Sequence, residues 1–135
     1  MANLLNVLFI EDDIIEGMKF NRVLDSLNFN YKLIEAANGE EALIILREKE
    51  IIPNIIFLDL NMPKLNGIQF LKILKNDEFL KQIPTIVFTT SNHRKDILEC
   101  YKIGIAGYII KPLKYEDYKV VVKKALDYWS VNELI

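Results

Sequence analysis

The chain has 135 residues, of which 51% are hydrophobic and 27% are charged, and its formal net charge at pH 7 is −2. This length fits one domain with a substantial core, and a near-neutral charge without a basic run argues against nucleic-acid binding through bulk electrostatics. Cys100 is the only cysteine, which excludes an intrachain disulfide and favours the reducing cytoplasm. The N-terminal apolar run is too short to cross a bilayer, so we expect a cytoplasmic protein without membrane contact.

Short apolar segments recur along the chain, and we predict that each of them forms a β-strand. Three of the five are continuously apolar rather than alternating, which is typical of strands covered on both faces of a sheet. The predicted strands are, in chain order, residues 4–10, 31–36, 54–59, 84–90 and 106–110.

The stretches after these segments are amphipathic and predict helices. Their apolar residues recur three and four positions apart, as on one face of a helix. The second stretch, "NGEEALIILREKE", begins at Asn38 with Glu41 three residues later, and Asp13 with Glu16 repeats that capping-box pattern before the first helix. The other stripes are Phe20, Val23, Leu24 and Leu27; Phe70, Ile73 and Leu74; Ile97, Cys100 and Tyr101, ended by Gly104; and Tyr118, Val121, Val122, Ala125, Leu126 and Trp129.

Strands and helices therefore alternate strictly, which predicts a doubly wound α/β fold: a five-stranded parallel sheet with helices on both faces, of the flavodoxin-like (βα)5 type. We expect a single domain over residues 1–135, with its core at about 4–128 and a short C-terminal extension at 129–135. In such folds, ligands bind outside the carboxyl ends of the strands, near a topological switch point.

Reactive side chains stand at the ends of four predicted strands. The first strand ends in Glu11 and Asp12, the third in Asp59, the fourth in Thr89 and the fifth in Lys111, whereas the second ends in alanines. With the first strand central and the third and fourth beside it, these side chains would converge on one shallow site.

Three carboxylates in one place repel one another unless a cation neutralises them, and a hard divalent ion such as Mg²⁺ binds through oxygen ligands. A carboxylate such as that of Asp59 can act as a nucleophile and form an aspartyl phosphate. Lys111 supplies a compact positive charge for a phosphoryl oxygen, and Thr89 supplies a hydroxyl. These residues predict metal-dependent phosphoryl transfer onto Asp59.

At this point the sequence resembles the receiver domain of two-component response regulators. The segments "VLFIEDD", "IIFLDLNMPKLNG", "IVFTTS" and "YIIKP" are similar to the acidic pair, phosphoacceptor loop, switch hydroxyl and Lys-Pro pair of that family, in the same order. The resemblance covers nearly the whole chain. The chain also resembles the single-domain receivers used by some phytochrome-type kinases, which carry short C-terminal extensions like "DYWSVNELI".

The resemblance implies a role for each matching residue. Asp12 would bind the metal directly and Glu11 partly through water, while Asp59 would be both the phosphoacceptor and a metal ligand. Asn61 would offer its backbone carbonyl to the metal, which would be Mg²⁺ or Mn²⁺. Gly67 would be the glycine of the loop that follows the phosphoacceptor.

Further roles follow from the same resemblance. Thr89 would be the hydroxyl that moves to the phosphoryl group, and Lys111 would bridge to it. The Lys111–Pro112 peptide would be cis. Tyr108 would be the aromatic residue whose orientation follows phosphorylation.

The implied function is that of a single-domain response regulator. A sensor histidine kinase or a histidine phosphotransfer protein would phosphorylate Asp59, and the surface of the fourth helix, fifth strand and fifth helix would then change. Output would be contact with a downstream protein rather than nucleic-acid binding or built-in catalysis, and the same surface could also form a homodimer.

Three alternatives stay open at this point. A metal-dependent phosphatase with an aspartyl nucleophile would be an enzyme, but its second acid is replaced by Asn61. A flavin carrier of similar topology would need a hydroxyl- and glycine-rich loop where "IEDDIIEG" has carboxylates. A receiver-like scaffold that is not phosphorylated would not need the acid, hydroxyl and lysine set.

A few residues outside this site have local interpretations. We expect His93 to be solvent-exposed near the start of the fourth helix, with Ser91 or Asn92 as its cap, and Cys100 to fill the core. Tyr128 and Trp129 fit intramolecular packing and a partner surface equally well.

Overall fold

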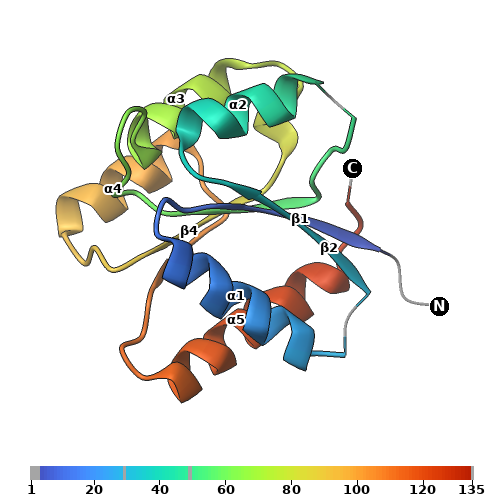
Figure 1. The fold of residues 1–135 in the computed structure, drawn as a ribbon. Coiled ribbons are helices and arrows are strands. Elements are labelled where there is room, and N and C mark those ends of the chain that lie inside the picture. Colours follow the sequence, from blue (N-terminus) through green and yellow to red (C-terminus); the bar gives the residue numbers. More distant parts are fainter. Residues whose placement is uncertain (1–3, 29, 49, 135) are drawn as a thin grey trace.

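The computed structural model describes residues 4–28, 30–48 and 50–134, in which strands and helices alternate from the N-terminus to the C-terminus (Figure 1). The strands are β1 (Leu5–Ile10), β2 (Tyr31–Ala36), β3 (Ile55–Leu58), β4 (Thr85–Thr89) and β5 (Gly107–Ile110). The helices are α1 (Ile14–Ser26), α2 (Gly39–Glu48), α3 (Gly67–Asn76), α4 (Arg94–Ile103) and α5 (Tyr115–Ser130), with a short 3₁₀ turn, η1 (Leu80–Gln82). The predicted α/β fold is confirmed, and η1 is an addition to it.

The strands form one parallel sheet in the order β2-β1-β3-β4-β5. The central strand is therefore β3, with β1 and β4 on either side of it, and the expectation that the first strand is the central one was wrong. β2 lies on one side of β1, whereas β3, β4 and β5 follow one another on the other side. The strand order therefore reverses between β1 and β3. Ile10 pairs with Leu58, so β1 and β3 end at the same level. Leu58 pairs with Val87, and β4 continues beyond that pair to Thr89.

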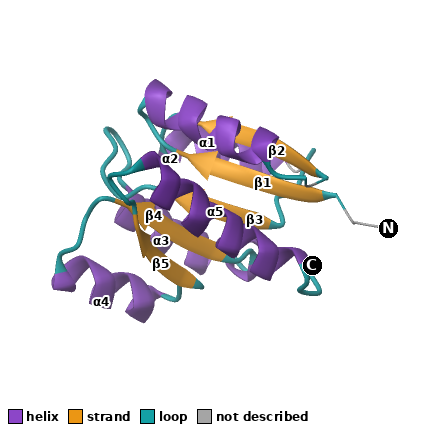
Figure 2. Cartoon of the chain, turned by 90° about the horizontal axis from the view of Figure 1, so that it is seen from below, coloured by secondary structure: helices purple, strands orange, loops and turns teal. Residues whose placement is uncertain are grey.

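Helices cover both faces of the sheet, with α1 and α5 on one side and α2, α3 and α4 on the other (Figures 1 and 2). Alternate residues of a strand face opposite layers. Leu8 and Ile10 of β1 accordingly pack into the core under α2 and α3, while Val7 and Phe9 pack into the core under α1 and α5. This double coverage is the reason why the strand sequences are continuously apolar.

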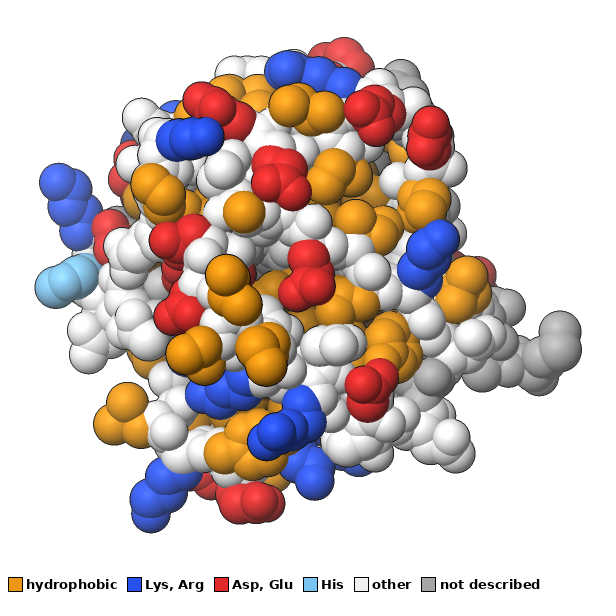
Figure 3. All heavy atoms as spheres, viewed as in Figure 1, with side chains coloured by type: hydrophobic (Ala, Val, Ile, Leu, Met, Phe, Trp, Pro, Cys, Tyr) orange, Lys and Arg blue, Asp and Glu red, His pale blue; other side chains and the backbone are white. Residues whose placement is uncertain are grey.

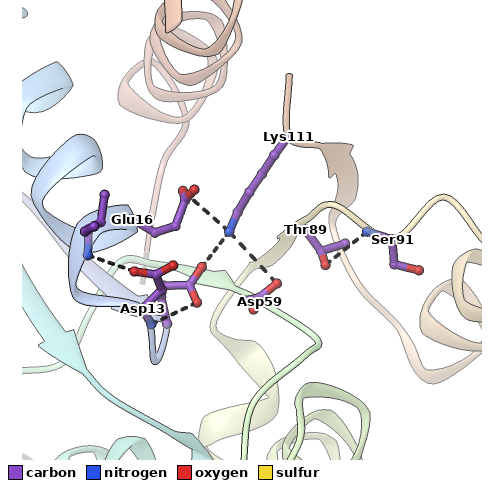
Figure 4. Close-up of polar contacts among 8 residues, drawn as sticks. Asp13, Glu16, Asp59, Thr89, Ser91 and Lys111 are labelled. Carbon is purple, nitrogen blue, oxygen red and sulfur yellow. Dashed lines mark hydrogen bonds and ion pairs between the residues drawn. The ribbon is translucent and has the colours of Figure 1, made fainter. Parts of the chain in front are cut away.

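Local sequence signals account for some of the helix ends. Asp13 caps α1, but its carboxylate accepts a hydrogen bond from the Ile15 backbone N–H at 2.9 Å, and the expected capping box with Glu16 is not formed. Glu16 instead points at Lys111 (Figure 4). Gly104 ends α4 as predicted, with φ at 120°, a conformation that glycine adopts without strain.

The end of the chain packs against the α1/α5 layer. Trp129 is partly buried in that core, whereas Tyr128 is 60% exposed and meets the Trp129 ring edge-on at 5.2 Å. His93 is exposed and Cys100 is buried, both as expected, but neither Ser91 nor Asn92 stands at the cap position of α4, which His93 occupies. On the face shown in Figure 3, surface hydrophobic side chains lie among acidic and basic ones. In the described part of the chain, every helix is too short or too polar to cross a membrane.

Candidate functional site

The predicted site residues lie at the carboxyl edge of the sheet, where the backbone hydrogen bonds continue past the strands. The Asp59 N–H donates to the Ile10 carbonyl at 3.0 Å, and the Lys111 N–H donates to the Thr89 carbonyl at 2.7 Å. The Glu11 N–H donates to the Ala36 carbonyl at 3.0 Å. Asp59, Lys111 and Glu11 each stand just after the end of a strand, and each is held in place by a backbone hydrogen bond to the neighbouring strand.

The three predicted acidic residues meet at this edge. One carboxylate oxygen from each of Glu11, Asp12 and Asp59 lies within 4.8 Å of the other two. Glu11 and Asp59 are buried, whereas Asp12 is exposed and faces the opening. Converging carboxylate oxygens with one side open to water are the donor set that Mg²⁺ or Mn²⁺ requires, so these residues fit a divalent cation.

Lys111 crosses from β5 into this acidic cluster (Figure 4). Its ammonium nitrogen lies 2.5 Å from a carboxylate oxygen of Glu11, 3.7 Å from one of Glu16 and 4.0 Å from one of Asp59. Only 6% of the Lys111 side chain is exposed. One buried cation is thus shared by three carboxylates, and the negative charge of the site is only partly neutralised.

Burial and charge act in opposite directions on the ionisation of this cluster. Burial raises the pKa of Glu11 to about 7, and the nearby ammonium of Lys111 opposes that rise. Burial alone would lower the pKa of Lys111, but the hydrogen bond with Glu11 and the charges of Asp59, Glu11 and Glu16 outweigh burial and raise it. Lys111 therefore stays protonated at neutral pH.

Thr89 and Tyr108 are joined through the backbone of Ser91. The Ser91 N–H donates to the Thr89 hydroxyl at 3.3 Å, and the Tyr108 hydroxyl donates to the Ser91 carbonyl at 2.9 Å. The Ser91 hydroxyl in turn donates to the Asp96 carboxylate in the first turn of α4 at 2.7 Å. One residue therefore connects the predicted hydroxyl and aromatic switch residues with helix α4.

The loop after Asp59 is held close to it by α3. Gly67 donates its N–H to the Leu60 carbonyl at 3.0 Å. The loop contains Lys64 at φ 63°, in the left-handed region that side chains adopt infrequently. Asn61 is exposed within the same loop.

The prediction of a cis Lys111–Pro112 peptide was wrong for this structure, since no peptide bond among the described residues is cis. The trans form of a bond before proline is favoured by about 0.5–1 kcal/mol. With this bond trans, Lys111 still forms its backbone bond to Thr89 and its ion pair with Glu11.

A groove of about 320 Å³ opens beside the acidic cluster, between α1 and the start of α2. Its wall includes Glu11, Asp12, Asp13, Glu35 and Glu41, so it is strongly acidic. Glu11 and Asp12 of the acidic cluster thus line this groove, whereas Asp59 and Lys111 do not.

Sequence reasoning missed two residues that contact the predicted ones. Ser91 links Thr89 to Tyr108 through its backbone, which no side-chain pattern indicates. Glu16 was assigned to a helix cap because Asp13 stands three residues before it, although its partner is Lys111, 95 positions further along the chain.

Comparisons of the sequence and of the structure with known proteins point to the same family. The family described as the response regulator receiver domain matches residues 7–123. The probable methanogenesis regulatory protein FilR2 of Methanothrix harundinacea is 34% identical over 127 residues, which cover 91% of this chain and 82% of that protein. Response regulator Rcp1 of Synechocystis is 30% identical over 128 residues, which cover 91% of this chain and 87% of Rcp1.

Solved structures of similar proteins share the whole architecture. The crystal structure of the Mn²⁺-bound form of Rcp1 has a TM-score of 0.90 at 28% identity and covers 97% of this chain and 99% of that one. The crystal structure of the phosphorylated cyanobacterial phytochrome response regulator RcpA has a TM-score of 0.92 at 28% identity, and the match covers 98% of this chain and 99% of that one.

Proposed function

The chain belongs to the response regulator receiver domain family, and on this premise we propose that it is a phosphorylation switch of two-component signalling whose phosphoacceptor is Asp59. Receiver domains of this family act as signalling domains that interact with histidine kinases and downstream targets. The donor here is a sensor histidine kinase or a histidine phosphotransfer protein in the cytoplasm. The receiver core comprises about residues 4–128, followed by a short extension.

One observation carries the proposal: the carboxylate of Asp59 lies between a cation and two further acids at the open end of the sheet. Its oxygen is 4.0 Å from the Lys111 ammonium, and it belongs to the acidic cluster with Glu11 and Asp12. A carboxylate that served only as a loop residue would have no reason to be buried beside two others. The arrangement supports a nucleophile that acts where negative charge is to be neutralised.

In the proposed transfer, an oxygen of the Asp59 carboxylate attacks the phosphorus of a phosphohistidine. The new O–P bond forms as the N–P bond breaks, and the imidazole nitrogen leaves with the electron pair. Lys111 neutralises charge on the transferred phosphoryl oxygens, and the Thr89 hydroxyl donates a hydrogen bond to one of them. Apart from the Asp59 nucleophile, the chain therefore contributes position and charge.

We further propose that Asp12 and Asp59 bind Mg²⁺ or Mn²⁺ directly, with Glu11 partly through water and the backbone carbonyl of Asn61 as another ligand. When bound, the ion would neutralise the phosphoryl oxygens and the excess negative charge of the cluster. The relative Rcp1, which was solved with Mn²⁺, supports this choice of metal.

The proposed switch passes through Ser91. When the Thr89 hydroxyl turns to the phosphoryl group, the Ser91 N–H loses its present acceptor, and Tyr108 is bound to the other end of the same residue. Tyr108 then turns inward, and the surface of α4, β5 and α5 changes. This surface is the proposed contact for a downstream protein or for a second copy of the chain, as in a receiver that serves a phytochrome-type kinase.

Incubation with acetyl phosphate and Mg²⁺, followed by intact-mass measurement, tests the proposal. Wild type should gain one phosphoryl group, and Asp59→Asn should gain none. Equal labelling of the two proteins would refute the assignment of Asp59. Sustained hydrolysis of a phosphomonoester would instead favour a phosphatase.

A further inference from the structure

The third carboxylate at Lys111, that of Glu16, lies outside the predicted metal site. It comes from the first turn of α1, and one of its oxygens lies 3.7 Å from the Lys111 ammonium. That oxygen is buried and has no hydrogen-bond partner among the described residues. Its ion pair with Lys111 is thus the interaction that orients it inward (Figure 4).

The position of Lys111 reflects a competition among its three partners. Its ammonium is closest to Glu11, next to Glu16 and farthest from Asp59, so it is held toward the α1 side of the site. A phosphoryl group on Asp59 must draw the ammonium away from that side. Under the function proposed above, a bound metal ion would engage Glu11 and so weaken its hold on Lys111. Glu16 lies outside the metal site and would still attract the Lys111 ammonium away from the phosphoryl group.

The surroundings strengthen this competition. The Lys111 ammonium lies 5.7 Å from the centre of the Phe88 ring, and the centres of the Phe88 and Tyr118 rings are 5.2 Å apart. The Tyr118 hydroxyl is also buried without a hydrogen-bond partner in the described structure, and Lys19 lies over the Tyr118 ring at 4.2 Å. The aromatic rings beside Lys111 screen charge less than water does, so the Glu16 carboxylate acts on Lys111 more than it would between fully exposed side chains.

We propose that Glu16 is a positioning residue that restrains the Lys111 ammonium from the phosphoryl group on Asp59 and so lowers the affinity of the site for that group. This inference rests on the proposed function, because it assigns a role in the same transfer. Glu16 is not a member of the acidic cluster of Glu11, Asp12 and Asp59, and it acts through Lys111.

The test is the affinity for beryllofluoride, a stand-in for the phosphoryl group, measured by calorimetry at saturating Mg²⁺. Glu16→Gln keeps the shape of the side chain and removes its charge, and it should bind beryllofluoride about twofold to fivefold more tightly than wild type, the range expected for a partly exposed ion pair. Glu16→Asp keeps the charge and should stay closer to wild type than Glu16→Gln does. Should Glu16→Gln fail to fold, Glu16→Ala provides the same loss of charge.

Two controls separate the proposed role from a general change of charge. Glu41→Gln makes the same charge change in the first turn of α2, in the wall of the acidic groove but away from Lys111, and should leave the affinity unchanged. In a Lys111→Met background, Glu16→Gln should have no effect on the affinity, because the group through which Glu16 acts is absent. A structural effect of Glu16→Gln would persist in that background.

Unchanged or weaker binding by Glu16→Gln would overturn the inference, and so would an equal gain in both backgrounds. These results leave the proposed function in place as long as wild type is labelled on Asp59. If wild type neither accepts phosphate nor binds beryllofluoride, the proposed function fails, and the inference fails with it.

Discussion

Gly67 faces the backbone of Asp59 so closely that a β-carbon on Gly67 would lie 2.5 Å from the Asp59 carbonyl oxygen and 2.6 Å from the Cα of Leu60. Real β-carbons do not approach backbone atoms at such distances. The absence of a side chain at the first residue of α3 therefore permits the loop after Asp59 to fold against that helix. Gly67 sets the position of Asp59 without taking part in its chemistry.

We expect Gly67→Ala to lower the free energy of unfolding by about 1–3 kcal/mol, because the backbone around Asp59 must shift to admit the methyl group. Labelling of Asp59 by acetyl phosphate should slow as the carboxylate is displaced. Urea unfolding and intact-mass time courses measure the two effects. Gly107→Ala is the matched control, since a β-carbon there would meet nothing within 4 Å. Equal behaviour of the two variants would contradict the positioning role of Gly67.

The sequence predicted the strands and their order of alternation well, because continuous apolar runs leave few other structures for these segments. Predicted strands 54–59 and 84–90 differ by one residue at each end from the observed β3 and β4. The turn η1 was missed because its signal is a single side chain, that of Asp77, which accepts hydrogen bonds from the backbone of Phe79 and Leu80. Which strand is central depends on crossovers between distant segments, and local pattern does not specify it.

The positions of site residues that directly follow a strand could be predicted from the sequence. A contact between side chains from distant parts of the chain could not. Asp59 and Lys111 follow strands, so topology brought them together. The choice of Glu16 between a helix cap and Lys111 depends on the energy of a contact across 95 positions, which spacing along the chain does not reveal. The isomer of the Lys111–Pro112 bond rests on a difference of about 0.5–1 kcal/mol, too small to be read from two residues.

We expect Lys111→Met to destabilise the metal-free protein by about 1–3 kcal/mol, because it leaves the buried carboxylates of Glu11 and Asp59 without a cation. The same change should tighten Mg²⁺ binding, since the ion becomes the only neutralising charge. Urea unfolding with and without Mg²⁺ measures both effects. Lys123→Met, which removes an exposed ion pair with Asp127, should change stability by no more than about 0.5 kcal/mol. A weaker Mg²⁺ affinity in Lys111→Met than in wild type would contradict the view that Lys111 and the ion neutralise the same carboxylates.

The ionisation of Glu11 should couple metal binding to pH. Burial raises the pKa of Glu11 to about 7 from its ordinary 4.5. Because the folded-state pKa is the higher one, the stability contributed by this proton is fully present below about pH 4.5 and is lost as the pH rises through about 7.

The metal requires the ionised carboxylate, so its affinity should change in the opposite direction to the stability of the metal-free protein. Mg²⁺ affinity should rise by at most about tenfold per pH unit up to about pH 7 and then level off. Calorimetric titrations at about pH 6, 7 and 8 measure this dependence. Glu11→Gln should bind Mg²⁺ more weakly and with little dependence on pH. A wild-type affinity that is flat over this range would exclude Glu11 as the titrating group.

Under the proposed function, the hydrogen bond from Tyr108 to the Ser91 carbonyl belongs to the unphosphorylated arrangement, so its removal should favour the phosphorylated one. Tyr108→Phe should lose about 0.5–1.5 kcal/mol of stability and bind beryllofluoride up to about tenfold more tightly, because the bond no longer opposes inward rotation of the ring. Tyr31→Phe removes a hydroxyl that donates to Asp25, at the opposite end of the sheet, and should lower stability without changing the affinity. Equal beryllofluoride affinities of Tyr108→Phe and wild type would mean that Tyr108 is not coupled to Asp59 through Ser91.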